Sequence, residues 1–114
     1  MNIIVLQHIK IEDPGFIKDL MLADNVNLTT IELDEGEKIP NNLTRFDGMF
    51  CMGGPMDTFM EQEYPWLVDE KKRIKEFVID LKKLYRIGKY RIGMSLYRYV
   101  SYRVMTVRVS SHLY

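Results

Sequence analysis

One stretch of the sequence decides the fold: Phe46-Asp47-Gly48-Met49-Phe50-Cys51-Met52-Gly53-Gly54-Pro55-Met56-Asp57. The apolar run at 49–52 is typical of a parallel strand that is covered on both faces. The two glycines after it have no Cβ, so the main chain can turn sharply and approach a ligand closely. In open α/β sheets, ligands bind beyond the carboxyl ends of the strands. The stretch therefore predicts a strand and then a loop whose N–H groups bind an anion.

The flanking segments predict a βα architecture. Residues 2–7, 28–33 and 48–52 are expected to be strands, and residues 14–23 a helix that Asp13 caps and Pro14 opens. The apolar residues of this helix are Phe16, Ile17, Leu20 and Met21. Since crossovers between parallel strands are right-handed, we expect a parallel sheet in the order 2-1-3.

A second helix is predicted over residues 66–82 by apolar residues that recur with helical spacing. Its apolar side consists of Leu67, Ile74, Phe77, Val78 and Leu81, and its solvent side of Asp69, Glu70, Lys72, Arg73, Lys75 and Glu76.

Residues 1–83 resemble the class I (triad-type) glutamine amidotransferases, in particular the group similar to the amidotransferase domain of GMP synthase. The resembling motifs are Ile3-Ile4-Val5-Leu6-Gln7-His8 with Glu12 and Pro14-Gly15, Glu35-Gly36-Glu37-Lys38-Ile39-Pro40, Phe46-Asp47-Gly48, Met52-Gly53-Gly54-Pro55-Met56, Tyr64-Pro65-Trp66-Leu67, and Glu70 with Ile74. Their combination is specific, whereas a Gly-Gly-Pro alone would not be.

The resemblance implies a flavodoxin-like, parallel, three-layer α/β fold, truncated in this chain. It implies that the enzyme hydrolyses glutamine to glutamate and ammonia, and that the ammonia passes to a synthetase or another acceptor. It also implies that the loop of Gly53 and Gly54 stabilises the oxyanion, with Gly54 as the donor, and that Pro55 and Met56 contact the substrate glutamine. No cofactor and no metal are expected.

The nucleophile of the family is missing from the sequence. In the family the second long helix leads into a strand and a G-x-C-x-G elbow, and a His and a Glu follow much later. After Lys83 this chain continues as Leu84-Tyr85-Arg86-Ile87-Gly88, and no such elbow occurs anywhere in it. We therefore expect no catalytic residue and an inactive chain. The alternative is a non-catalytic binding or regulatory module of flavodoxin-like fold.

Residues 84–114 differ from the body in composition. They contain no acidic residue, six Lys or Arg and six of the seven tyrosines, whereas residues 1–83 have a net charge of −6. The near-repeat at 85–93 adds low complexity. We interpret this tail as out-of-frame translation that replaces the catalytic half, with a natural basic extension as the alternative. Alternating side chains predict a strand or hairpin if the tail folds, and otherwise an exposed sheet edge.

The cysteine and the two histidines are not predicted to be catalytic. Cys51 is the only cysteine; it lies within the apolar run, so we expect a buried structural thiol. His8, near Glu12, is expected to be a hydrogen-bonded loop histidine more than a general base, and His112 has no assigned role. A receiver domain is disfavoured because Gln7-His8 stands where paired acids would be needed, and a flavodoxin because Ile9-Lys10-Ile11 is no phosphate loop.

The whole chain of 114 residues has room for one domain. Because it shows neither an apolar run that could span a bilayer nor a signal peptide, we expect a cytoplasmic protein without membrane contact. Tyrosine and arginine in the tail could stack on nucleic acid, but no recognised motif accompanies them, and nucleic-acid binding is not expected.

Overall fold

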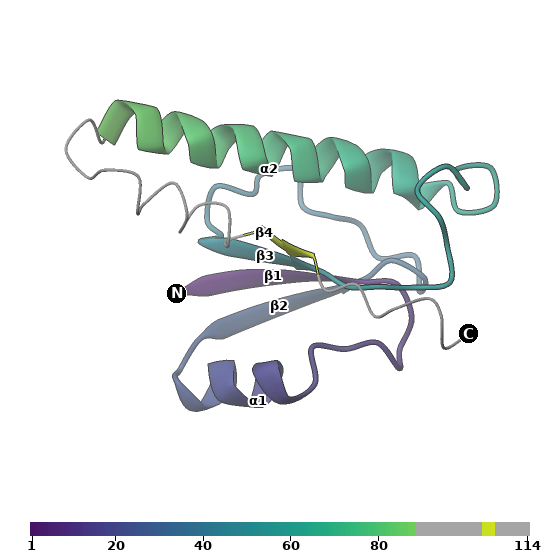
Figure 1. Ribbon diagram of the computed structural model, residues 1–114, viewed down its shortest axis with the longest axis horizontal. Helices are drawn as coiled ribbons and strands as arrows, with labels where there is room; N and C mark the ends of the chain where they lie inside the picture. The colour runs from purple at the N-terminus through teal and green to yellow at the C-terminus, as the bar shows by residue number, and fades with distance from the viewer. Residues whose placement is uncertain (89–103, 107–114) are drawn as a thin grey trace.

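A parallel sheet with one helix on each face forms the described part of the protein (Figure 1). The computed structural model describes the backbone of residues 1–88 and 104–106 and the side chains of residues 1–80. The elements in chain order are β1 (Asn2–Gln7), α1 (Phe16–Ala23), β2 (Asn27–Glu32), β3 (Gly48–Cys51), α2 (Trp66–Gly88) and β4 (Val104–Thr106). The strand order is β2-β1-β3-β4.

The predicted three-layer α/β fold and the order 2-1-3 are confirmed. β1 pairs in parallel with β2 on one side and with β3 on the other, so that Ile3 lies opposite both Leu28 and Gly48. β1 has the predicted bounds, while β2 begins and ends one residue early and β3 ends one residue early. Because β1 and β3 are parallel neighbours, their carboxyl ends lie at the same edge of the sheet.

The main core lies between the sheet and α2. Ile4, Leu6 and Met49 are fully buried there, because alternate residues of a strand face the same side of the sheet. Phe77 of α2 packs onto the same cluster, and Trp66 and Ile74 cover its margin. This apolar contact fixes α2 above the ends of β1 and β3.

Helix α2 corrects two expectations. It ends at Gly88 instead of residue 82, so it runs across the change in composition after Lys83. Glu70, which the sequence placed on the solvent side, is buried at 4% exposure. Its position falls within the stripe formed by Leu67 and Phe77, which places its carboxylate against the sheet.

Helix α1 is shorter than predicted and is not capped by Asp13. The helix begins at Phe16, after Gly15 at φ 55°, a conformation that favours glycine. The Asp13 side chain instead accepts a hydrogen bond from the N–H of Gly15 at 2.9 Å, which is a local turn rather than a helix cap. None of the residues of α1 is buried, and Phe16 is 74% exposed. The predicted apolar stripe of this helix is therefore largely open to solvent.

The tail contributes a fourth strand. Met105 of β4 pairs in parallel with Phe50 of β3, and the flanking pairs are Val104 with Met49 and Thr106 with Cys51. Of the two outcomes expected for this edge, an added strand or an exposed edge, the structure has the added strand along 49–51. The other predicted tail features, including the hairpin and His112, lie outside the described residues.

Candidate functional site

The loop that begins at Gly53 leaves the sheet directly beside the end of β1. The N–H of Met52 donates to the carbonyl oxygen of Leu6 at 2.9 Å, so the pairing of β1 and β3 continues past Cys51. This register places Gly53 next to His8, the first residue after β1. The candidate site is thus built from two adjacent strand ends, where ligands of parallel sheets bind.

His8 is held between two hydrogen-bond acceptors. Its Nδ1 lies 3.2 Å from the carbonyl oxygen of Gly53, and its Nε2 lies 2.5 Å from Oε1 of Glu70. The ring also stacks on Trp66, with 5.2 Å between the ring centroids and 16° between the planes. His8 is only 4% exposed. The expected hydrogen-bonded histidine is confirmed, and because both ring nitrogens are occupied, it is not free to act as a general base.

The surroundings of His8 favour its protonated form. Burial alone lowers the pKa of this imidazole, but its hydrogen bond to the carboxylate of Glu70 and the negative charge of that group raise it, as do the carbonyls of Gly53 and Met52. The net result is a raised pKa. A buried cation is stable here because a carboxylate pairs with it and hydrogen bonds satisfy both N–H groups.

A side chain at Gly54 would be crowded by its neighbours. A Cβ at this position would lie 2.7 Å from Sδ of Met56, 2.8 Å from its Cε and 3.0 Å from Cβ of His8. A side chain here would displace the flexible end of Met56 and crowd Cβ of His8, so glycine fits with the least disturbance. Among the described residues, no backbone or side-chain acceptor is recorded for the N–H of Gly54. The N–H groups of Gly53 and Met56 likewise have no recorded acceptor among these residues, so these three are the candidate donors of the loop.

Cys51 is the buried structural thiol that the sequence predicted. It is 6% exposed, and burial together with the negative charge of Glu70 raises its pKa to about 12. A thiol with this pKa is protonated at neutral pH and is not a nucleophile. The structure thus gathers a Cys, a His and a Glu at one place, but His8 bonds to Gly53 and Glu70, and no hydrogen bond to the thiol is recorded among the described residues.

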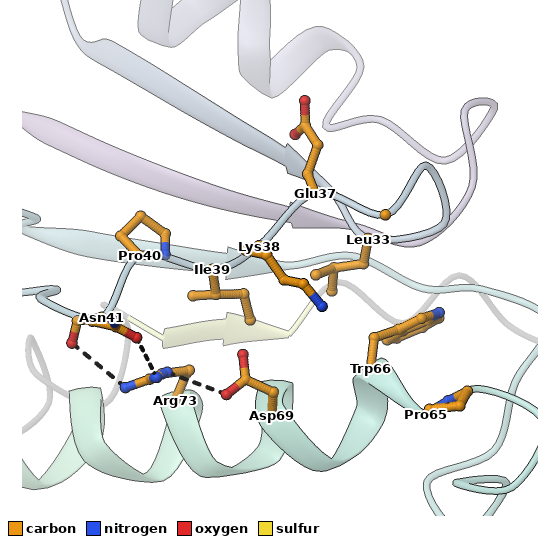
Figure 2. Close-up of a pocket in the computed structure, with 11 residues that line it drawn as sticks. Leu33, Glu37, Lys38, Ile39, Pro40, Asn41, Pro65, Trp66, Asp69 and Arg73 are labelled. Atoms are coloured by element: carbon orange, nitrogen blue, oxygen red, sulfur yellow. Dashed lines mark hydrogen bonds and ion pairs between the residues drawn. The ribbon is translucent and has the colours of Figure 1, made fainter.

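A groove of about 790 Å³ lies beside this site, between residues 33–41 and the first turns of α2 (Figure 2). Trp66 is common to both, since it lines the groove and stacks on His8. Arg73 joins the two walls: it donates to Oδ1 of Asn41 at 2.7 Å and lies 3.4 Å from a carboxylate oxygen of Asp69. The side chain of Lys38 also extends between the walls. The groove therefore has a mixed apolar and polar lining, and the ion pair of Arg73 with Asp69 and its hydrogen bond to Asn41 brace it.

The described part of the chain contains neither a metal-ligand cluster nor a membrane-spanning helix. No cluster of three or more potential ligands has the arrangement needed to hold a metal ion. Neither of the helices described has the length and apolar character that crossing a membrane requires.

Three solved structures share this fold. A glutamine amidotransferase from Thermotoga maritima matches 71% of this chain and 35% of its own, with a TM-score of 0.68 and 26% identity. The protein SMU.1228c matches 65% of this chain and 33% of its own, with a TM-score of 0.60 and 26% identity. A glutamine amidotransferase from Methylobacillus flagellatus matches 70% and 31%, with a TM-score of 0.64 and 21% identity. This chain contains part of a class I glutamine amidotransferase-like fold.

The chain spans about a third of the length of these structures. No protein-family model matches it, and no curated protein matches its sequence. The likeness to glutamine amidotransferases is therefore one of fold, over about 70% of this chain.

The structure brings together most residues of the predicted amidotransferase-like site. Gly53, Gly54 and Met56 lie at the carboxyl end of β3, while Pro55 is exposed. Their roles toward glutamine stay predictions. Sequence reasoning missed Glu70 as a partner of His8. The sequence did contain a signal for Glu70. The core-facing residues Leu67, Ile74 and Phe77 follow helical spacing, and position 70 completes that spacing as 3, 4 and 3 residues.

Proposed function

We propose that residues 1–83 are the N-terminal half of a class I glutamine amidotransferase-like domain, with Gly53 and Gly54 as its oxyanion loop. The supporting observation is the tightly packed glycine loop at the end of β3, in a chain whose fold matches part of two glutamine amidotransferases. In this proposal the N–H of Gly54 donates to the carboxamide oxygen of glutamine, and Pro55 and Met56 contact the rest of the substrate.

The chemistry of the whole domain is acyl transfer to a thiol. A cysteine thiolate activated by a histidine attacks the carboxamide carbon, ammonia leaves, and water releases glutamate from the thioester. One oxyanion donor contributes about 3 to 4 kcal/mol to the stability of the tetrahedral transition state. This chain supplies that donor but no G-x-C-x-G elbow, and Cys51 is a protonated thiol. We therefore propose glutamine binding without turnover.

The lack of the elbow also favours the second candidate, a non-catalytic binding or regulatory module that keeps the glutamine-side surface. Both candidates have a synthetase or another ammonia acceptor as partner, a kinship with the amidotransferase domain of GMP synthase, and a cytoplasmic location. In both, residues 84–114 are a segment of separate origin. The boundary after residue 83 is a change in composition. It is not a boundary between folded units, because α2 continues across it to Gly88.

The test is a titration of ¹⁵N-labelled protein with L-glutamine, monitored through backbone amide resonances. We expect shifts at Gly53, Gly54 and Met56, and their loss in Gly54→Ala, with D-glutamine as the stereochemical control. No shift at the loop with millimolar L-glutamine would contradict the substrate role of the loop.

The proposed absence of glutamine turnover is tested by a separate measurement. Purified protein should release no ammonia from glutamine above the buffer rate, and a chloroketone analogue of glutamine should not label Cys51 selectively. Turnover together with stoichiometric labelling of Cys51 would overturn it.

A further inference from the structure

The imidazole of His8 connects three parts of the fold that are far apart in sequence. It follows β1, its Nδ1 faces the carbonyl of Gly53 after β3, and its Nε2 faces Glu70 of α2. Both partners are acceptors. A neutral imidazole has a single N–H and can satisfy one of them, whereas an imidazolium has two and satisfies both. The geometry by itself thus selects the charged ring.

The groups that face His8 are consistent with this state. From α2 they are the carboxylate of Glu70 and the ring of Trp66, and from the end of β3 they are the carbonyls of Met52 and Gly53. The thiol of Cys51 is neutral, because burial raises its pKa to about 12. Glu70 is therefore the charged partner of the ring among the described contacts, and it lies at hydrogen-bonding distance.

The hydrogen bond to Gly53 sets the direction of a neighbouring donor. The peptide bond between Gly53 and Gly54 is trans, since the described chain contains no cis peptide. In a planar trans peptide the C=O and the N–H point in opposite directions. When the carbonyl of Gly53 points at His8, the N–H of Gly54 must point away from that ring. A flip of this one peptide would turn the N–H inward.

We propose that His8, held as an imidazolium by Glu70, is the positioning residue that aims the N–H of Gly54 outward as an oxyanion donor. The proposal rests on the oxyanion role suggested above for this loop. His8 touches neither substrate nor nucleophile in it; it acts through the Gly53 carbonyl. Gly54 is a close neighbour of His8, since a Cβ built on Gly54 would lie 3.0 Å from Cβ of His8.

Loss of the proton should release the loop. A neutral His8 beside the carboxylate of Glu70 keeps its single N–H on Nε2, since a charge-assisted hydrogen bond is about twice as strong as a neutral one. The lone pair of Nδ1 then faces the carbonyl oxygen of Gly53, and the two repel. Replacing Glu70 by glutamine changes this outcome. The amide can donate to Nε2, so a neutral ring keeps its N–H on Nδ1 and still holds Gly53.

The experiment follows the ring and the loop in the same NMR pH titration of the full chain. Imidazole ¹⁵N shifts report the protonation and tautomer of His8, and backbone amide shifts report Gly54. In the wild type, the Gly54 resonance should move in one transition with the same midpoint as His8. In Glu70→Gln this transition should disappear, with Gly54 staying near its low-pH position. His112→Gln is the control that removes the signals of the second histidine.

Three results would overturn the proposal: a Gly54 resonance that does not follow His8, a Glu70→Gln protein with the same transition as the wild type, or a neutral Nδ1–H tautomer in the wild type. The wild-type titration suffices even if a variant fails to fold. No ligand is used, so failure here is distinct from failure of the glutamine titration, which tests the role of the loop itself.

Discussion

Replacing Gly54 by alanine tests whether close packing fixes the loop. The new methyl group would lie 2.7 and 2.8 Å from the end of Met56 and 3.0 Å from Cβ of His8, where carbon contacts are normally 3.5 to 4.0 Å. The end of Met56 can rotate away, but His8 is held at both ring nitrogens. Overpacking of this kind typically costs about 1 to 3 kcal/mol. With a urea dependence of about 1 to 3 kcal/mol per M, the unfolding midpoint should fall by about 1 M.

A double-mutant cycle separates the two neighbours. Met56→Ala removes the Sδ and Cε atoms that the new methyl group meets, so Gly54→Ala should destabilise the Met56→Ala protein by about 1 kcal/mol less than it destabilises the wild type. The remaining cost reports the contact with His8. If Gly54→Ala unfolds at the same urea concentration as the wild type, the packing argument for this glycine is wrong.

Three further measurements follow from the structure. Because the pKa of His8 is raised in the folded protein, its ion pair stabilises the fold fully below the unfolded pKa of about 6.5. The urea midpoint should therefore fall as pH rises above that value through the folded pKa; an equal midpoint at pH 6 and pH 9 would contradict this. Cys51, with a pKa of about 12, should resist iodoacetamide at pH 8 in the native protein and react in urea, whereas rapid native labelling would show that it is accessible. A chain ended at Gly88 keeps α2 and loses β4, so it should be less stable by about 2 kcal/mol, since the edge of β3 loses backbone hydrogen bonds worth about 1 kcal/mol each. An unchanged urea midpoint would mean that β4 adds nothing.

The parallel three-layer arrangement was predictable because local patterns encode it. Buried strands such as 2–7 and 48–52 are short apolar runs, and the handedness of their crossovers leaves few ways to order them. The ends of the helices were less predictable. Asp13 has a typical cap residue type, but its oxygen bonds to the N–H of Gly15 in a turn before the helix. Side chains that can bond locally compete with the cap in this way.

Composition alone does not predict the structure of the tail, residues 84–114. Its change in charge after Lys83 is plain in the sequence, yet the helix continues to Gly88 because helix formation extends through residues of adequate propensity. The sequence allows two outcomes for the tail at the sheet edge, an added strand or an exposed edge, since a pairing partner cannot be inferred from alternation alone. Only the open edge of β3 decided that Met105 would lie opposite Phe50.

The sequence by itself determined the glycine loop and its place after a buried strand, because glycines following an apolar run are a local signal. Tertiary structure alone decided what holds that loop. His8 and Glu70 are 62 residues apart, and a polar side chain within an apolar helical stripe has no pattern that names its partner. The pair forms because burial of α2 against the sheet takes a carboxylate out of water, and a carboxylate in that place requires a hydrogen-bonded cation.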